Sequence, residues 1–221
     1  MNFDDVILIG SKNAGCRVIQ PTGEWALDSL GKEYDEIKEL APESDFLLAA
    51  VKITDWNGEL SPWRLKAVFG NEDFGDGAKA TLDFILNELI PYLEKECPCD
   101  NAEYYLCGYS LAGLFALWSA YNSNAFSGIA AVSPSVWFEG WGEYAETKAI
   151  LTKKVYLSLG DREEKAKNKR LAAVGEAIRA QAALLKERGV DCTLEMNPGN
   201  HFCEPEKRLA KGIARLVKGR R

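Results

Sequence analysis

Hydrophobic residues along the chain fall either in short continuous runs or at helical spacing. The run 46–53 is apolar without alternation, which is typical of a strand buried on both faces of a sheet. The stretch 77–96 instead carries apolar residues every three or four positions, which predicts an amphipathic helix that Pro91 can kink. The same patterns predict further strands at 104–107, 128–132, 154–159 and 191–196, and further helices at 25–40, 171–188 and 205–218, with another ending near 122.

Two β-prone runs open the chain, 6–10 and 16–20, on either side of the turn-forming residues 11–15. We expect these runs to form a hairpin or two neighbouring strands. From there strand and helix alternate to the end, without a repeat or a linker. The sequence therefore predicts a single α/β domain over 1–221, with a mostly parallel central sheet, helices on both faces and ligands bound beyond the carboxyl ends of the strands.

Composition and charge narrow the classes of partner. Apolar residues make up 47% of the 221 residues, enough for a sizeable core. A net charge of -6 leaves no basic field for a phosphate backbone, so we expect no nucleic acid partner. No apolar run reaches the ~18 residues of a membrane span, and the acidic start is unlike a signal peptide. We expect a cytoplasmic protein without membrane contact; the oligomeric state is open.

The cysteines suggest neither a metal site nor a redox site. Cys97 and Cys99 are the only close pair among six cysteines, and the single histidine lies elsewhere in the sequence. Cys203 follows that histidine by two residues but lacks a sharp turn between strand and helix, so it ranks below the serine described next as a nucleophile. We expect free thiols and no cofactor.

A strand, a sharp turn and a helix meet at Ser110. Small residues at Gly108, Ala112 and Gly113 allow the strand and the helix to approach closely, as in the turn that exposes a nucleophilic serine. A serine hydroxyl needs a base to accept its proton. His201 is the only histidine in the chain, so it is the only imidazole available for that role.

A carboxylate that lies between these two residues in the sequence would complete a catalytic triad. The cluster 161–164 follows the strand at 154–159, and the chain order serine, acid, histidine is the one used by α/β-hydrolases. In that fold the acid commonly lies three residues after the glycine that ends the strand, which favours Glu163. Asp161 and Glu164 are the alternatives.

An ester carbonyl that is under attack also needs backbone donors for its oxygen. The N–H of Leu111, at the start of the helix after Ser110, is one candidate. The second should come from the loop after an earlier strand. If 16–20 is that strand, the loop is 21–25 and Gly23 or a neighbour supplies the donor.

Four motifs carry a family resemblance, namely 108–113, 133–138, 159–164 and 199–201. With them the chain resembles the putative-esterase branch of the α/β-hydrolases, in which enterochelin (siderophore) esterases are the nearest relatives and esterase D-type enzymes lie further off. The resemblance implies hydrolysis of a small-molecule carboxylic ester through an acyl-enzyme, without a metal or an organic cofactor. An acyltransferase that uses the same acyl-enzyme, and an inactive binding module on the same fold, are the alternatives.

The substrate side of the site is less defined by the sequence. Only about twenty residues separate the strands at 128–132 and 154–159, so we expect no large lid domain. Four tryptophans lie in loops after strands and are candidates for stacking on a substrate: Trp56, Trp63, Trp137 and Trp141. They serve equally well to pack these loops against the domain.

Overall fold

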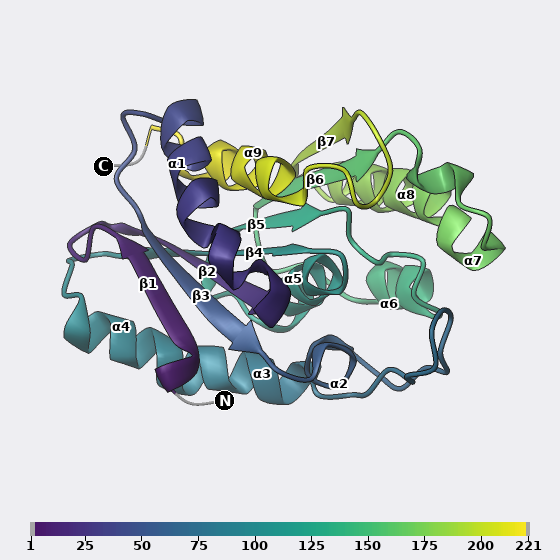
Figure 1. Cartoon of the computed structure of the whole chain (residues 1–221), viewed down its shortest axis with the longest axis horizontal. Coiled ribbons are helices and arrows are strands. Elements are labelled where there is room, and N and C mark those ends of the chain that lie inside the picture. Colours follow the sequence, from purple (N-terminus) through teal and green to yellow (C-terminus); the bar gives the residue numbers. More distant parts are fainter. Residues whose placement is uncertain (1–2, 220–221) are drawn as a thin grey trace.

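The computed structural model describes residues 3–219 (Figure 1). Its central element is a seven-stranded sheet in the order β1-β3-β2-β4-β5-β6-β7. The strands are β1 (Val6–Gly10), β2 (Cys16–Gly23), β3 (Leu47–Ile53), β4 (Glu103–Tyr109), β5 (Phe126–Val132), β6 (Lys154–Gly160) and β7 (Asp191–Asn197). Every neighbouring pair is parallel except β1 with β3, which confirms the mostly parallel sheet.

The expected pairing of the first two strands is wrong. β3 lies between β1 and β2: Val51 pairs with Val6 on one side and with Pro21 on the other. β3 is buried on both faces, as its continuous apolar run predicts, and an interior place in the sheet provides that burial. The turn at 11–15 therefore connects two strands that have β3 between them, and it does not close a hairpin.

Helices cover both faces of the sheet, as expected (Figure 1). One face packs against α1 (Leu30–Leu40) and α9 (Pro205–Val217). The other packs against α3 (Ala78–Phe84), α4 (Ile90–Glu96), α5 (Leu111–Asn122), α6 (Trp141–Thr147) and α8 (Val174–Glu187). Two shorter helices, α2 (Trp56–Leu60) and α7 (Lys169–Ala172), complete the set within residues 3–219.

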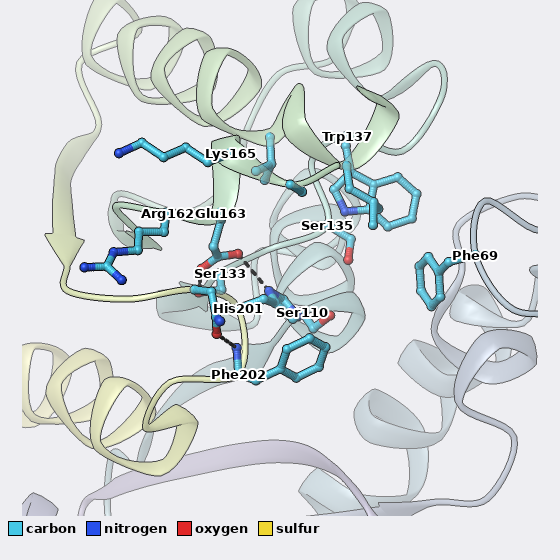
Figure 2. Close-up of a pocket in the computed structure, with 14 residues that line it drawn as sticks. Phe69, Ser110, Ser133, Ser135, Trp137, Arg162, Glu163, Lys165, His201 and Phe202 are labelled. Atoms are coloured by element: carbon cyan, nitrogen blue, oxygen red, sulfur yellow. Dashed lines mark hydrogen bonds and ion pairs between the residues drawn. The ribbon is translucent and has the colours of Figure 1, made fainter. Parts of the chain in front are cut away.

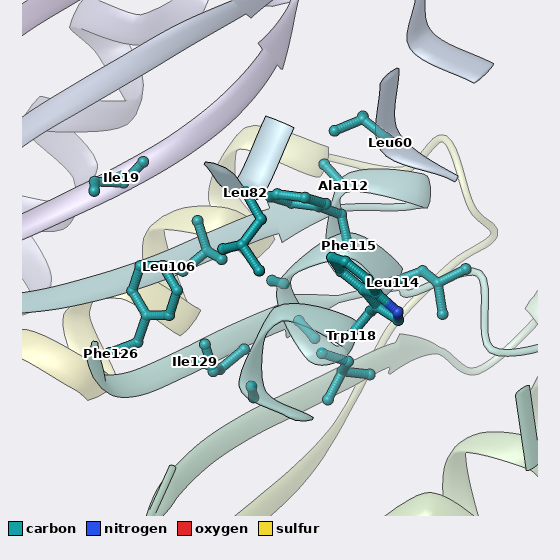
Figure 3. Packing of buried hydrophobic residues seen from close by; sticks show 14 of the residues in the cluster. Ile19, Leu60, Leu82, Leu106, Ala112, Leu114, Phe115, Trp118, Phe126 and Ile129 are labelled. Atoms are coloured by element: carbon teal, nitrogen blue, oxygen red, sulfur yellow. The ribbon is translucent and has the colours of Figure 1, made fainter. Parts of the chain in front are cut away.

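Successive residues of a strand point into the hydrophobic clusters on opposite faces of the sheet. In β4, Leu106 points into the larger cluster around α5, while Tyr105 and Cys107 point into the cluster beneath α1 and α9. α5 itself is buried almost all round, and Phe115 and Trp118 fill the space over the strands (Figure 3). The helix that follows Ser110 is therefore held rigidly against the sheet.

Several predicted helices are interrupted. The first, expected over 25–40, begins with a 3₁₀ turn at Glu24–Ser29. The second contains a π-helical turn, Ile85–Leu89, directly before Pro91, whose ring nitrogen cannot donate to the carbonyl of Asn87. α2 and α6 were not predicted, since five and seven residues are too few to establish a periodicity.

The segment between β5 and β6 holds only α6 as a regular element, so the expectation of no large lid is confirmed. Within residues 3–219, no helix combines the length and the hydrophobicity that a membrane span requires.

Candidate active site

The backbone turns sharply at Ser110, between β4 and α5. Its dihedral angles, φ 59° and ψ -119°, are strained for a residue with a side chain. The turn is secured by Ser110 N, which donates to Val132 O at 3.0 Å. Gly108 is required beneath it, since a Cβ there would lie 2.4 Å from the backbone of Ala112. The strain is a local cost that presents the hydroxyl of Ser110 at the sheet edge.

The structure brings Ser110, His201 and Glu163 together at the carboxyl ends of the strands (Figure 2). Nε2 of His201 lies 3.1 Å from Oγ of Ser110, and Nδ1 lies 2.7 Å from Oε2 of Glu163. Ser110 follows β4, Glu163 opens a 3₁₀ turn after β6, and His201 lies in the loop after β7. Both ring nitrogens therefore have a partner within hydrogen-bond distance.

The two alternative carboxylates are engaged elsewhere. Oδ1 of Asp161 accepts a hydrogen bond from Gly199 N at 2.9 Å. Oε2 of Glu164 accepts one from Nη2 of Arg179 at 2.5 Å. Glu163 is thus the only carboxylate of this cluster in contact with His201. No group of three or more His, Cys, Asp or Glu side chains is arranged to hold a metal ion in the part of the chain that the structure describes.

Glu163 is buried and hydrogen-bonded on both oxygens. Its Oε1 accepts from Ser133 Oγ at 2.7 Å, from Gly160 N at 2.7 Å and from Nη1 of Arg208 at 3.1 Å. Burial acts to raise the pKa of this carboxyl, but the bond and the charge of His201, with the donors Ser133 and Gly160, outweigh it. The pKa of Glu163 is therefore lower than usual, and the group is an anion at neutral pH.

Three residues that sequence reasoning did not single out individually support this arrangement: Tyr109, Ser133 and Arg208. The hydroxyl of Tyr109 donates to the carbonyl of His201 at 2.6 Å. Burial raises the pKa of Tyr109, which keeps its hydroxyl a donor. Ser133 lies within a motif that the sequence did indicate, whereas nothing in the sequence distinguishes Arg208 from the exposed cations of α9.

A cavity of about 600 Å³ adjoins Ser110. Aromatic side chains form much of its wall, and Figure 2 shows Phe69 and Trp137 beyond Ser110 on the side away from Glu163. The lining residues are Phe69, Ser110, Ser133, Ser135, Trp137, Arg162, Glu163, Lys165, Ala166, Leu171, Val174, Asn200, His201 and Phe202. Phe202 is 86% exposed, so it stands at the mouth of the cavity.

Of the four candidate tryptophans, only Trp137 lines the cavity. Trp141 is 1% exposed and donates from Nε1 to Gln181 in the core, so it is placed to pack the domain and not to meet a substrate. Trp63 donates to Glu139 O at 2.9 Å, and Trp56 packs on Trp25. None of these three side chains lines the cavity.

The two candidate oxyanion donors, Leu111 and Gly23, differ in how their positions compare with the prediction. Leu111 is the first residue of α5, where backbone N–H groups have no partner within the helix. Gly23 is the last residue of β2 and pairs with Ile53, so the expectation that it lies in a loop is wrong. Ile19 of β2 lies opposite Leu106 of β4. The pairing of β2 with β4 ends at these two residues, four positions before Gly23 and Ser110.

Solved structures share this fold. The chain resembles an IroE-like serine hydrolase from Shewanella oneidensis with a TM-score of 0.79 and 18% identity, over 96% of this chain and 75% of that one. It resembles the siderophore hydrolase EstA from Aspergillus nidulans with a TM-score of 0.73 and 18% identity, over 96% and 94%. For the enterobactin esterase FES from Shigella flexneri the values are 0.68 and 16%, over 96% and 54%.

A comparison with protein families identifies the chain more directly than the solved structures do. The search among curated proteins found no match. A family model described as "Putative esterase" matches residues 28–205, which include the turn at Ser110, the acidic cluster and the loop of His201. The chain therefore belongs to the putative esterase family of the α/β-hydrolases and is a carboxylic ester hydrolase.

Proposed function

We propose that the protein hydrolyses carboxylic esters through an acyl-enzyme formed on Ser110. The observation that carries this proposal is a pair of hydrogen-bond contacts: Ser110 Oγ lies 3.1 Å from Nε2 of His201, and Nδ1 of His201 lies 2.7 Å from Oε2 of Glu163. A serine hydroxyl is a weak nucleophile and requires these contacts, since an oriented imidazole must accept its proton.

In the proposed reaction, Ser110 Oγ attacks the acyl carbon while its proton passes to Nε2 of His201. The tetrahedral intermediate collapses as His201 returns that proton to the departing alcohol, which leaves the acyl group on Ser110. Water then attacks the acyl-enzyme while His201 accepts its proton. His201 returns that proton to Ser110 Oγ as the bond between Oγ and the acyl carbon breaks, and the carboxylic acid is released. Glu163 holds the imidazole in the required tautomer and stabilises its protonated form.

Backbone groups at the sheet edge are the proposed donors to the oxyanion. Leu111 N, at the N-terminus of α5, has the position and the dipole for this role. The second donor is proposed from the end of β2, at Gly23 or a neighbouring residue, because β2 is parallel and adjacent to β4 and its carboxyl end lies at the same edge of the sheet as Ser110.

The proposed substrate is a small ester with an aromatic or extended apolar group. The support is the cavity wall formed by Phe69, Trp137 and Leu171 next to Ser110. Siderophore esters are natural compounds to test first, because solved structures of similar fold are described as a siderophore hydrolase and an enterobactin esterase.

Turnover of a short aryl ester and of enterobactin, by wild type, Ser110→Ala and His201→Ala, tests this function. We expect hydrolysis of the aryl ester by wild type and a loss of about 10³-fold or more in each variant. Wild-type kcat in Ser110→Ala would overturn the proposal. Product analysis with an added alcohol separates hydrolysis from acyl transfer, and free acid as the main product is expected.

A further inference from the structure

One buried guanidinium touches the ends of four neighbouring strands. Nη1 of Arg208 lies 3.1 Å from Glu163 Oε1, after β6, and 3.3 Å from Ser133 Oγ, after β5. It also lies 3.3 Å from the hydroxyl of Tyr109, at the end of β4. Nη2 donates to the carbonyls of Pro198 and Asn200, after β7, at 2.9 and 3.0 Å.

The site is shaped for this fork. The side chain of Arg208 is 3% exposed, and that of Glu163 is 4% exposed. A Cβ on Gly160 would lie 2.4 Å from Gly199 O and 3.0 Å from both Nη atoms, so glycine at the end of β6 leaves room for the loop after β7 and for the guanidinium. A buried charge is costly unless it is paired and hydrogen-bonded, and these five acceptors satisfy it.

These contacts reach His201 by two routes. Through Glu163, Arg208 meets the carboxylate that faces Nδ1 of the ring. Arg208 also contacts the backbone around His201. It donates to the hydroxyl of Tyr109, which in turn donates to the carbonyl of His201, and it donates directly to the carbonyl of Asn200, the residue before His201. The acid and the loop that carries the base are therefore tied to one rigid, planar group.

We propose that Arg208 is a positioning residue of the esterase, which aligns Glu163 with the imidazole of His201 from the C-terminal helix α9. The inference rests on the proposed function, because it assigns Arg208 a role through that triad. It predicts that loss of the fork lowers turnover per active site while leaving substrate binding in the cavity largely unchanged, since Arg208 does not line the cavity.

The test compares Arg208→Met, Arg208→Lys and Lys207→Met. Methionine keeps much of the apolar stem without the charge, and lysine keeps the charge without the fork. Lys207 is the exposed neighbour on α9, paired with Glu204, and serves as the matched control. Each variant is checked for folding by circular dichroism. Active sites are then titrated with a fluorophosphonate, so that kcat is expressed per labelled site.

We expect kcat per labelled site to fall about 10²-fold in Arg208→Met, with KM little changed and Lys207→Met like wild type. Arg208→Lys should have an intermediate kcat per labelled site, because lysine restores a charge beside Glu163 but not the planar fork.

A purely structural role would give a different result. It would lower the fraction of labelled sites but leave kcat per labelled site as in wild type, and that outcome overturns the inference. If Arg208→Met does not fold, wild-type kcat per site in Arg208→Lys overturns it equally. Full activity of Ser110→Ala would mark failure of the proposed function. An inactive Ser110→Ala beside an unaffected Arg208→Met would mark failure of this inference alone.

Discussion

Oε2 of Glu163 lies 2.7 Å from Nδ1 of His201, while its other oxygen accepts three hydrogen bonds from Ser133, Gly160 and Arg208. A carboxylate held in this way has little freedom to rotate. The contact to the imidazole is therefore a fixed feature of the fold, and it separates Glu163 from Asp161 and Glu164.

Replacement of Glu163 by glutamine should lower kcat on a short aryl ester by about 10²-fold or more. The amide cannot stabilise the protonated imidazole, and it favours the wrong tautomer of His201. Asp161→Asn and Glu164→Gln should keep activity near that of wild type, because these residues contact Gly199 and Arg179 instead. Equal activity in all three variants would contradict the assignment and indicate a serine–histidine dyad.

The same carboxylate should make stability depend on acid. The folded-state pKa of Glu163 is below the ordinary 4.5, so its contribution to stability is present above about pH 4.5 and is lost as pH falls through the folded value. Urea unfolding of wild type and Glu163→Gln measures this contribution. The difference in free energy of unfolding between the two proteins should shift in favour of Glu163→Gln as the pH falls below 4.5. A constant difference would contradict the prediction.

Glu33 should have the opposite pH dependence. It is buried in α1, Gln20 donates to its Oε2 at 3.4 Å, and its Oε1 has no hydrogen-bond partner. Burial raises its pKa to about 8, so folding favours the protonated form and stability falls as pH rises from about 4.5 to 8. Glu33→Gln should remove a slope of up to about 1.4 kcal/mol per pH unit. An identical pH dependence in wild type and variant would refute this.

The turn at Ser110 should not tolerate a side chain at Gly108. A Cβ there would lie 2.4 Å from the backbone of Ala112, so Gly108→Ala should destabilise the protein by about 1–3 kcal/mol and reduce labelling of Ser110. Gly142→Ala is the matched control, since open space surrounds that glycine in α6. Thermal unfolding of the two variants tests the argument, which fails if they unfold at the same temperature.

Trp137 should be the tryptophan that affects substrate binding. Trp137→Ala removes part of the cavity wall, so KM for an aryl ester should rise about 3- to 10-fold more than KM for an acetyl ester. Trp141→Phe removes the bond to Gln181 in the core and should lower stability with KM unchanged. A KM effect in Trp141→Phe that matched the effect in Trp137→Ala would contradict this division.

Local sequence patterns predicted the features that depend on few residues. The small residues around Ser110 and the single histidine predict a nucleophile and its base, because both predictions depend on residue type and chain order. The continuous apolar run of β3 likewise predicted its burial. The place of β3 between β1 and β2 was not predictable, since strand order depends on long-range packing that no short pattern encodes.

The finer parts of the site depend on tertiary contacts. Glu163 differs from Glu164 only in which side of a short 3₁₀ turn it occupies, and the sequence of that turn does not specify the side. Trp137 and Trp141 are four residues apart, yet one lines the cavity and the other is buried. Arg208 lies about 100 positions after Ser110, and only the folded chain brings it into contact with Glu163.

Labelling with a fluorophosphonate, followed by mass spectrometry of the modified peptide, tests the central claim most directly. The account predicts one adduct per chain, on Ser110, which is absent in Ser110→Ala and strongly slowed in His201→Ala. An adduct that persists in Ser110→Ala, or a folded wild-type protein that turns over ester without any labelling, would contradict it.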